Sequence, residues 1–95
     1  MPDVAGRRLR RNNEVVFDMA GERAVLLDAS GRELITLNPV GSIVWNELDG
    51  ARDAAALAAD LHGRFTGVDH DELTRDIDAF LDELAALGLA VDAAR

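Results

Sequence analysis

The apolar residues of this chain change their spacing once, at Asn38-Pro39. Before that point they lie in three short runs rich in β-forming residues, at 14–19, 23–28 and 32–37. Gly21-Glu22 offers a turn between the first two runs. Ala29-Ser30-Gly31 forms a second turn between the last two, with a glycine suited to positive φ. The first half therefore predicts a three-stranded antiparallel sheet.

After Asn38-Pro39 the apolar residues recur every three or four positions, which is typical of amphipathic helices. Helices are predicted at 39–48, 54–65 and 70–87. Each follows a preferred N-cap residue and ends before a glycine, in the pairs Asn38 and Gly50, Asp53 and Gly67, Asp69 and Gly88. The fold class is therefore α+β, a winged helix-turn-helix-like domain with a three-stranded antiparallel sheet followed by three α-helices.

Burial is predicted from the same spacing. In the first helix we expect a buried face, with Trp45 beside it, made of Val40, Ile43, Val44 and Leu48. In the third helix the continuous apolar stripe comprises Leu73, Ile77, Phe80, Leu81, Leu84 and Leu87.

The 95 residues suffice for a single domain. We expect residues 1–13 to form a flexible, Arg-rich N-terminal arm, residues 14–91 the folded domain, and residues 92–95 a short C-terminal tail. Within the domain, the apolar segment Leu89-Ala90-Val91 is expected to pack back on the core.

The net charge of −8 is unevenly distributed. Residues 1–11 carry four arginines and one aspartate, whereas the remainder carries six arginines and seventeen acids. The third helix has one arginine, Arg75, against seven acids over residues 69–83. Because such a surface repels phosphate, the helix-turn-helix-like outline is not expected to bind nucleic acid.

No pattern in the sequence indicates catalysis. The chain has no cysteine, and its two histidines, His62 and His70, lie on different predicted elements with no motif around them, His62 on the exposed side of its helix. No phosphate-binding loop, serine nucleophile motif or calcium loop is present, so we expect no enzyme activity, metal or cofactor. No apolar run suits a signal or a membrane span, which predicts a cytoplasmic protein without membrane contact.

A peptide-binding role fits what remains. The outer strands of a three-stranded sheet have unpaired N–H and C=O groups, to which an extended peptide can add as a further strand. The third predicted strand has no internal proline, and a long helix beside it could supply an apolar wall. An open edge also allows self-pairing, so a homodimer or a domain swap is compatible with this sequence.

The residues from Leu37-Asn38-Pro39-Val40-Gly41-Ser42-Ile43-Val44-Trp45 to Leu48-Asp49-Gly50 resemble the hallmark of PqqD-like proteins. The resemblance continues through residues 56–61, 76–84 and 88–89 and covers about residues 14–91. It implies an element that recognises the leader peptide of a ribosomally synthesised precursor and presents it to a modifying enzyme. Partners in such pathways are radical S-adenosylmethionine enzymes, cyclodehydratases and the leader peptidase of lasso-peptide biosynthesis. The second strand here ends Leu26-Leu27-Asp28-Ala29, without the proline of the protein serving pyrroloquinoline quinone synthesis, which leaves the pathway open.

The resemblance also implies where the peptide binds, namely along the third strand and against the third helix. The residues carried over are Arg32, Glu33, Leu34, Ile35, Thr36 and Leu37 in the strand and Arg75, Asp76, Ala79, Phe80 and Glu83 in the helix. The sequence does not tell which border of the helical stripe faces the strand, the one with Asp76, Phe80 and Glu83 or the one with Thr74, Asp78, Leu81 and Ala85.

The sequence leaves the partner of Arg75 and the class of function open. Arg75 could pair with an acidic residue of the leader or with Asp71 one turn away. Proline at Ile35 is expected to abolish peptide binding by removing a strand donor. The alternatives to leader binding are an adaptor subunit that binds an enzyme but no peptide, and a degenerate winged-helix DNA-binding protein.

Overall fold

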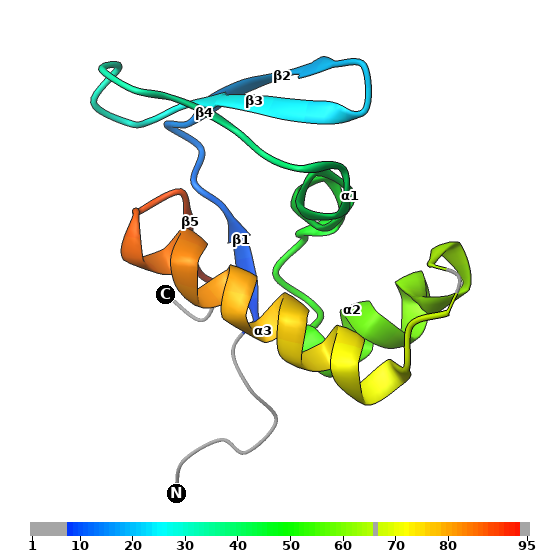
Figure 1. Cartoon of the computed structure of the whole chain (residues 1–95). Helices are drawn as coiled ribbons and strands as arrows, with labels where there is room; N and C mark the ends of the chain where they lie inside the picture. Colours follow the sequence, from blue (N-terminus) through cyan, green and yellow to red (C-terminus); the bar gives the residue numbers. More distant parts are fainter. Residues whose placement is uncertain (1–7, 66, 94–95) are drawn as a thin grey trace, which may run out of the picture.

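Three strands and then three α-helices form the main part of the fold, as the sequence predicts, with one further short strand before them and one after them (Figure 1). The computed structural model describes residues 8–65 and 67–93. The sheet lies at one end of the molecule and α3 (His70–Ala86) at the other (Figure 1). Between them lie α1 (Pro39–Glu47) and the short strands β1 (Leu9–Arg11) and β5 (Ala90–Asp92). The α+β fold class is confirmed.

The three-stranded sheet has the order β2-β3-β4 and is antiparallel throughout. Its strands are β2 (Val16–Ala20), β3 (Arg23–Leu27) and β4 (Leu34–Thr36). Gly21 has a φ of 64° and Gly31 a φ of 73°, so both predicted turns use a glycine in the left-handed region. β4 is shorter than the predicted run 32–37.

The helices begin at the predicted caps. They are α1 (Pro39–Glu47), α2 (Ala54–Leu61), the short 3₁₀ helix η1 (His62–Arg64) and α3 (His70–Ala86). The side chains of Asn38, Asp53 and Asp69 each accept a hydrogen bond from a backbone N–H in the first turn. The predicted second helix was too long, because the chain tightens into η1 after Leu61.

The chain ends form a second sheet that the sequence analysis missed. β1 (Leu9–Arg11) pairs antiparallel with β5 (Ala90–Asp92). The prediction of a flexible arm over 1–13 and a tail over 92–95 is therefore wrong for these strands, because Leu9 is buried and its backbone pairs with the end of the chain. Residues 1–7 of the arm and 94–95 of the tail lie outside the described residues.

The core lies between the inner face of the sheet and the helices. Trp45 is fully buried, and the Phe17 ring meets its ring edge-on at a centroid distance of 5.5 Å. The buried Ser42 hydroxyl accepts the Ala24 N–H at 2.7 Å and donates to the Asn38 carbonyl at 2.8 Å, which ties β3 to the start of α1.

The solvent exposure predicted for three side chains was wrong. Val40 is 43% exposed and Leu87 is 62% exposed, although both belong to predicted apolar faces, because each lies at the margin of a groove described below. His62 is partly buried rather than exposed, since its ring Nε2 is hydrogen-bonded to the Val68 carbonyl. Within residues 8–65 and 67–93, no helix has the length and apolar character needed to cross a membrane.

Candidate functional site

β4 is an edge strand, because β3 is its single strand neighbour in the described part of the chain. The Leu37 N–H donates to the Ala24 carbonyl at 2.9 Å, and the Glu33 carbonyl accepts the Asp28 N–H at 3.1 Å. Hydrogen-bonded positions alternate along an antiparallel pair, so Ile35, midway between them, also directs its backbone groups towards β3.

The backbone groups of Leu34 and Thr36 consequently point to the open edge. Neither residue forms a hydrogen bond to another described segment through these groups. The expected effect of proline at Ile35 therefore has to be corrected, since that N–H serves the sheet itself. Proline at position 36 would instead remove an N–H donor from the free edge.

Asp28 shapes the turn that presents β4. Its Oδ1 accepts hydrogen bonds from the Ser30 hydroxyl at 2.9 Å and from the N–H groups of Arg32 at 2.9 Å and Glu33 at 3.3 Å. The Arg32 N–H, followed by the Ser30 hydroxyl, holds the pKa of Asp28 below its ordinary value. The turn is thus organised by the ionised carboxylate.

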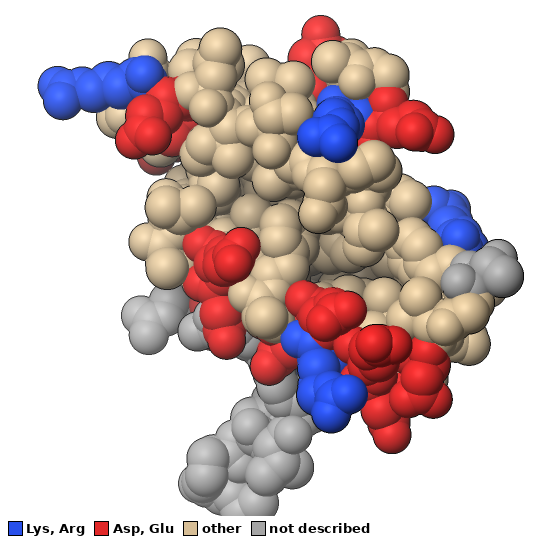
Figure 2. Space-filling model, viewed as in Figure 1, with Lys and Arg blue, Asp and Glu red and all other residues tan. Residues whose placement is uncertain are grey.

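A groove of about 270 Å³ separates the edge of β4 from α3. Its lining residues are Ile35, Thr36, Leu37, Asn38, Phe80, Glu83, Leu84, Leu87 and Leu89. Figure 2 shows this face hollowed between the sheet and α3, with uncharged side chains around the hollow and carboxylates gathered over α3. Glu83 is the one charged residue of the lining. The groove is therefore an apolar cleft directly beside free main-chain groups.

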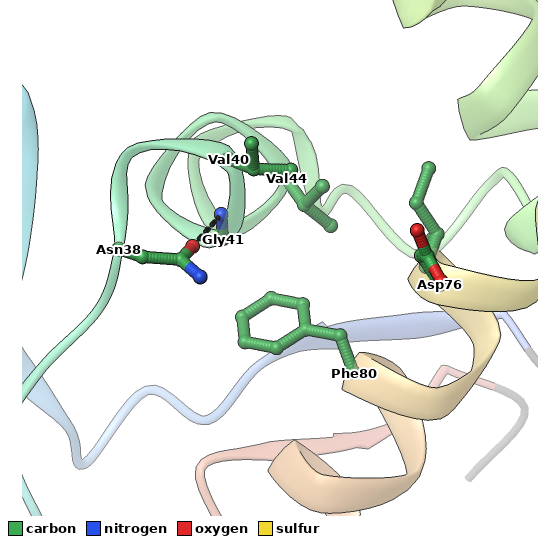
Figure 3. A pocket seen from close by; sticks show the side chains of 7 residues that line it. Asn38, Val40, Gly41, Val44, Asp76 and Phe80 are labelled. Carbon is green, nitrogen blue, oxygen red and sulfur yellow. Dashed lines mark hydrogen bonds between the residues drawn. The ribbon is translucent and has the colours of Figure 1, made fainter. Parts of the chain in front are cut away.

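A second pocket of about 300 Å³ continues the groove between α1 and α3. It is lined by Asn38, Val40, Gly41, Val44, Asp76, Ile77 and Phe80. In Figure 3 the Phe80 ring extends from α3 towards Asn38 and the first turn of α1. A Cβ on Gly41 would lie 3.2 Å from the nearest ring carbon and 3.0 Å from Asn38 Oδ1. The missing side chain at Gly41 is what lets the ring approach.

The border of α3 that faces β4 is the one with Asp76, Phe80 and Glu83. All three line the groove or the pocket that continues it, whereas Thr74 and Asp78 of the other border line neither. This settles the choice that the sequence left open.

The predicted site residues fall into two groups. Of the strand set, Ile35, Thr36 and Leu37 line the groove, whereas Arg32, Glu33 and Leu34 are exposed beside it, Leu34 at 72%. Of the helix set, Arg75 and Ala79 are exposed and lie outside the lining. Arg75 forms no ion pair with any described residue, so the pair with Asp71, one of the two alternatives that the sequence left open, is not observed.

Sequence reasoning missed the half of the groove that α1 builds. Asn38 was predicted as a helix cap and Val40 and Val44 as core residues, yet all three line the second pocket together with Gly41, and of the two valines only Val44 is also buried. Leu87 was likewise taken for a buried residue. The helical spacing could not separate pocket walls from core, because both are apolar and lie on one face.

The two histidines lie close to each other. The rings of His62 and His70 lie edge to face with centroids 6.3 Å apart, and His70 Nδ1 is 3.8 Å from Asp71 Oδ1. Among residues 8–65 and 67–93, no three His, Cys, Asp or Glu side chains are grouped so that they could hold a metal ion.

Comparisons with known proteins converge on one family. The family model of coenzyme PQQ synthesis protein D (PqqD) matches residues 23–90, which include β3, β4 and all three α-helices. The PqqA binding protein of Pseudomonas fluorescens (strain SBW25) is 34% identical over 73 residues, which are 77% of this chain and 76% of that protein.

Two solved structures have the same fold, each with a TM-score of 0.75 and 25% sequence identity. One is TbiB1 in complex with the TbiA(beta) leader peptide, where the similarity covers 85% of this chain and 93% of the other. The second is lasso peptide synthetase B1 complexed with the leader peptide, with 88% and 98% covered. Both structures contain a leader peptide.

Proposed function

The chain belongs to the PqqD family, and we propose that it binds the leader segment of a ribosomally synthesised precursor peptide. The leader adds as a fourth strand beside β4 and places its inward side chains in the groove against α3. The protein itself is not an enzyme. It presents the rest of the precursor to a modifying enzyme, of the radical S-adenosylmethionine or cyclodehydratase type, or to a leader peptidase, in the cytoplasm where precursors are translated.

One observation carries this proposal, namely that the free edge of β4 and an apolar groove are adjacent. Leu34 and Thr36 offer outward N–H and C=O groups for main-chain bonds, each worth about 0.5–1.5 kcal/mol net. The two pockets that meet at Phe80 accept apolar side chains, each contributing about 1.5–3 kcal/mol. Because ordering a flexible peptide offsets part of this gain, we expect a dissociation constant of about a micromolar.

The test is a fluorescence-polarisation titration of the purified protein with a labelled leader segment from a precursor encoded beside its gene. We expect saturable binding, unaffected by excess duplex DNA, because α3 and its cap Asp69 together carry one arginine and seven acids. Absence of binding at tens of micromolar for every neighbouring precursor overturns the proposal. Co-purification with a neighbouring enzyme in that case identifies an adaptor subunit instead.

A further inference from the structure

Two carboxylates lie on the α3 side of the groove. Asp76 lines the pocket against α1, and Glu83 lines the groove beside β4. Both side chains are exposed, and neither forms an ion pair with a described residue. No arginine or histidine is among the residues that line either space. The groove therefore has an apolar floor and a negative rim.

The two carboxylates lie within reach of two long side chains on one face of a strand. They are seven residues apart on one helix, which is about 10 Å along its axis at 1.5 Å per residue. Side chains on one face of a strand recur every second residue, so two of them four residues apart are separated by about 13 Å. Phe80 lies between Asp76 and Glu83 and lines both spaces. A peptide side chain midway between the two carboxylates would therefore contact the Phe80 ring.

We propose that the groove selects a leader segment with the pattern cation–x–apolar–x–cation on the face turned towards α3. The two cations pair with Asp76 and Glu83, and the apolar side chain between them packs on Phe80. This inference rests on the proposed function and deepens it by naming the chemistry of the leader. The overall charge of −8 adds a longer-range attraction for a cationic peptide.

The inference also changes the role expected of Arg75. A leader acid paired with Arg75 would require this cation at the groove, but Arg75 lies outside the lining. On a helix with 3.6 residues per turn, it projects about 100° further round α3 than Asp76, away from Phe80. Recognition of the leader's charge is therefore assigned to the two rim acids.

The experiment compares three labelled synthetic peptides with the encoded leader. The peptides are identical except at the two charged positions, which are both Lys, both Thr or both Glu, with Leu midway between them. In fluorescence polarisation at about 0.05 M salt, we expect the Lys peptide to bind about tenfold more tightly than the Glu peptide, and the difference to shrink at about 0.5 M salt.

Charge-reversed variants locate the effect. Asp76→Lys should remove most of the preference for the Lys peptide, as should Glu83→Lys. Asp78→Lys is the matched control, because it makes the same change of charge on the opposite border of α3, outside the groove. Circular dichroism verifies that all three variants are folded.

The outcomes separate this inference from the proposed function. If the encoded leader fails to bind, the proposed function is wrong. If the leader binds but the Lys and Glu peptides bind equally, or neither binds, charge selection by the groove is wrong and leader binding stands. Loss of the preference in Asp78→Lys to the same extent as in Asp76→Lys also overturns the inference, because net charge alone then accounts for it.

Discussion

The two edges of the sheet differ in how their outward backbone groups are used. At the β4 edge, the N–H groups of Leu34 and Thr36 have no acceptor among the described residues. At the β2 edge, the register directs Met19 outward, and its N–H donates to Asp18 Oδ1 at 2.8 Å. One edge is therefore open, whereas the other is partly satisfied by its own carboxylate.

The surroundings of the two edges differ as well. Beside β4 lies a groove whose far wall is α3. Beside β2, the Phe17 side chain is held between the Trp45 ring and the Arg11 guanidinium, and Met19 Sδ accepts a hydrogen bond from Asn46 at 3.5 Å. A pocket of about 260 Å³ also lies near this edge, lined by Met19, Glu22, Pro39, Ser42, Ile43 and Asn46. Beside β4, by contrast, two adjoining spaces that share Asn38 and Phe80 lie next to outward main-chain groups that have no partner among the described residues. From this comparison we expect the leader to bind at the β4 edge.

The largest effect is expected from proline at the open edge. Thr36→Pro removes an outward N–H and leaves the leader carbonyl opposite it unpaired, which should weaken leader binding about 10- to 100-fold. Proline is tolerated at an edge position whose N–H faces solvent, so the fold should survive. Fluorescence polarisation measures the affinity, and circular dichroism the fold.

Met19→Pro is the matched control for this change, since it removes an outward N–H from the other edge. It should leave leader affinity within about twofold of wild type. Equal losses in the two variants would contradict the assignment of recognition to β4. Ile35→Pro should instead destabilise the protein, because its N–H belongs to the β3–β4 ladder.

The fold was predictable because its signals are local. Glycine turns, the caps Asn38, Asp53 and Asp69, and the change of spacing at Asn38-Pro39 each act within a few residues. The β1–β5 sheet escaped prediction because it joins segments some 80 residues apart. Neither three-residue strand carries a period that distinguishes it from an arm or a tail.

The site was predictable only in part, for a related reason. Residues of the strand and helix named from the sequence line one groove, but the mutual orientation of these elements depends on tertiary packing. The α1 wall of the groove depends on Gly41, whose role is visible only once the Phe80 ring lies against it. A glycine in a helix predicts a cost in stability, not the partner that approaches it.

Gly41→Ala tests whether the pocket between α1 and α3 contributes to leader binding at the β4 edge. The added methyl would lie 3.2 Å from the Phe80 ring and 3.0 Å from the capping Asn38 Oδ1, so the ring must shift within the pocket. Crowding of this kind costs about 1 kcal/mol or more, and leader binding should weaken about fivefold. Helix propensity favours alanine by about 1 kcal/mol, so the thermal midpoint should change little.

Gly63→Ala serves as its control, because a Cβ at Gly63 would meet nothing within 4 Å. Its leader affinity should equal that of wild type. A Gly41→Ala variant that binds the leader as tightly as Gly63→Ala would show that the α1–α3 pocket takes no part in recognition, leaving the edge of β4 and the adjoining groove as the site.

Asp28→Ala should have a smaller effect, because it loosens the turn before β4 without touching the groove. We expect leader binding about threefold weaker, with faster amide exchange at Arg32 and Glu33. The pKa of Asp28 is lowered in the folded protein, so its contribution is present above the ordinary value of 3.8 and is lost as pH falls through the folded pKa.

Wild-type protection of these amides against exchange should therefore decline below pH 3.8. In Asp28→Ala, which lacks this carboxylate, that contribution to the decline should be absent. Ser30→Ala, which removes one of the donors to Asp28, should show a weaker version of the same effect. Identical pH profiles for wild type and Asp28→Ala would show that this carboxylate does not organise the turn.

The smallest effect is expected at the protected edge. Asp18→Ala leaves the Met19 N–H without its acceptor, which makes the β2 edge available for pairing with a second copy of the chain. Because pairing through a five-residue strand alone buries little surface, the resulting dimer should be weak, with a dissociation constant of about a millimolar by sedimentation equilibrium. Glu22→Ala removes the same charge from the exposed β2–β3 turn without freeing a backbone group and should stay monomeric. If both variants associate equally, reduced net charge is the cause. The carboxylate of Asp18 then does not protect the edge, and the contrast between the two edges rests on the groove alone.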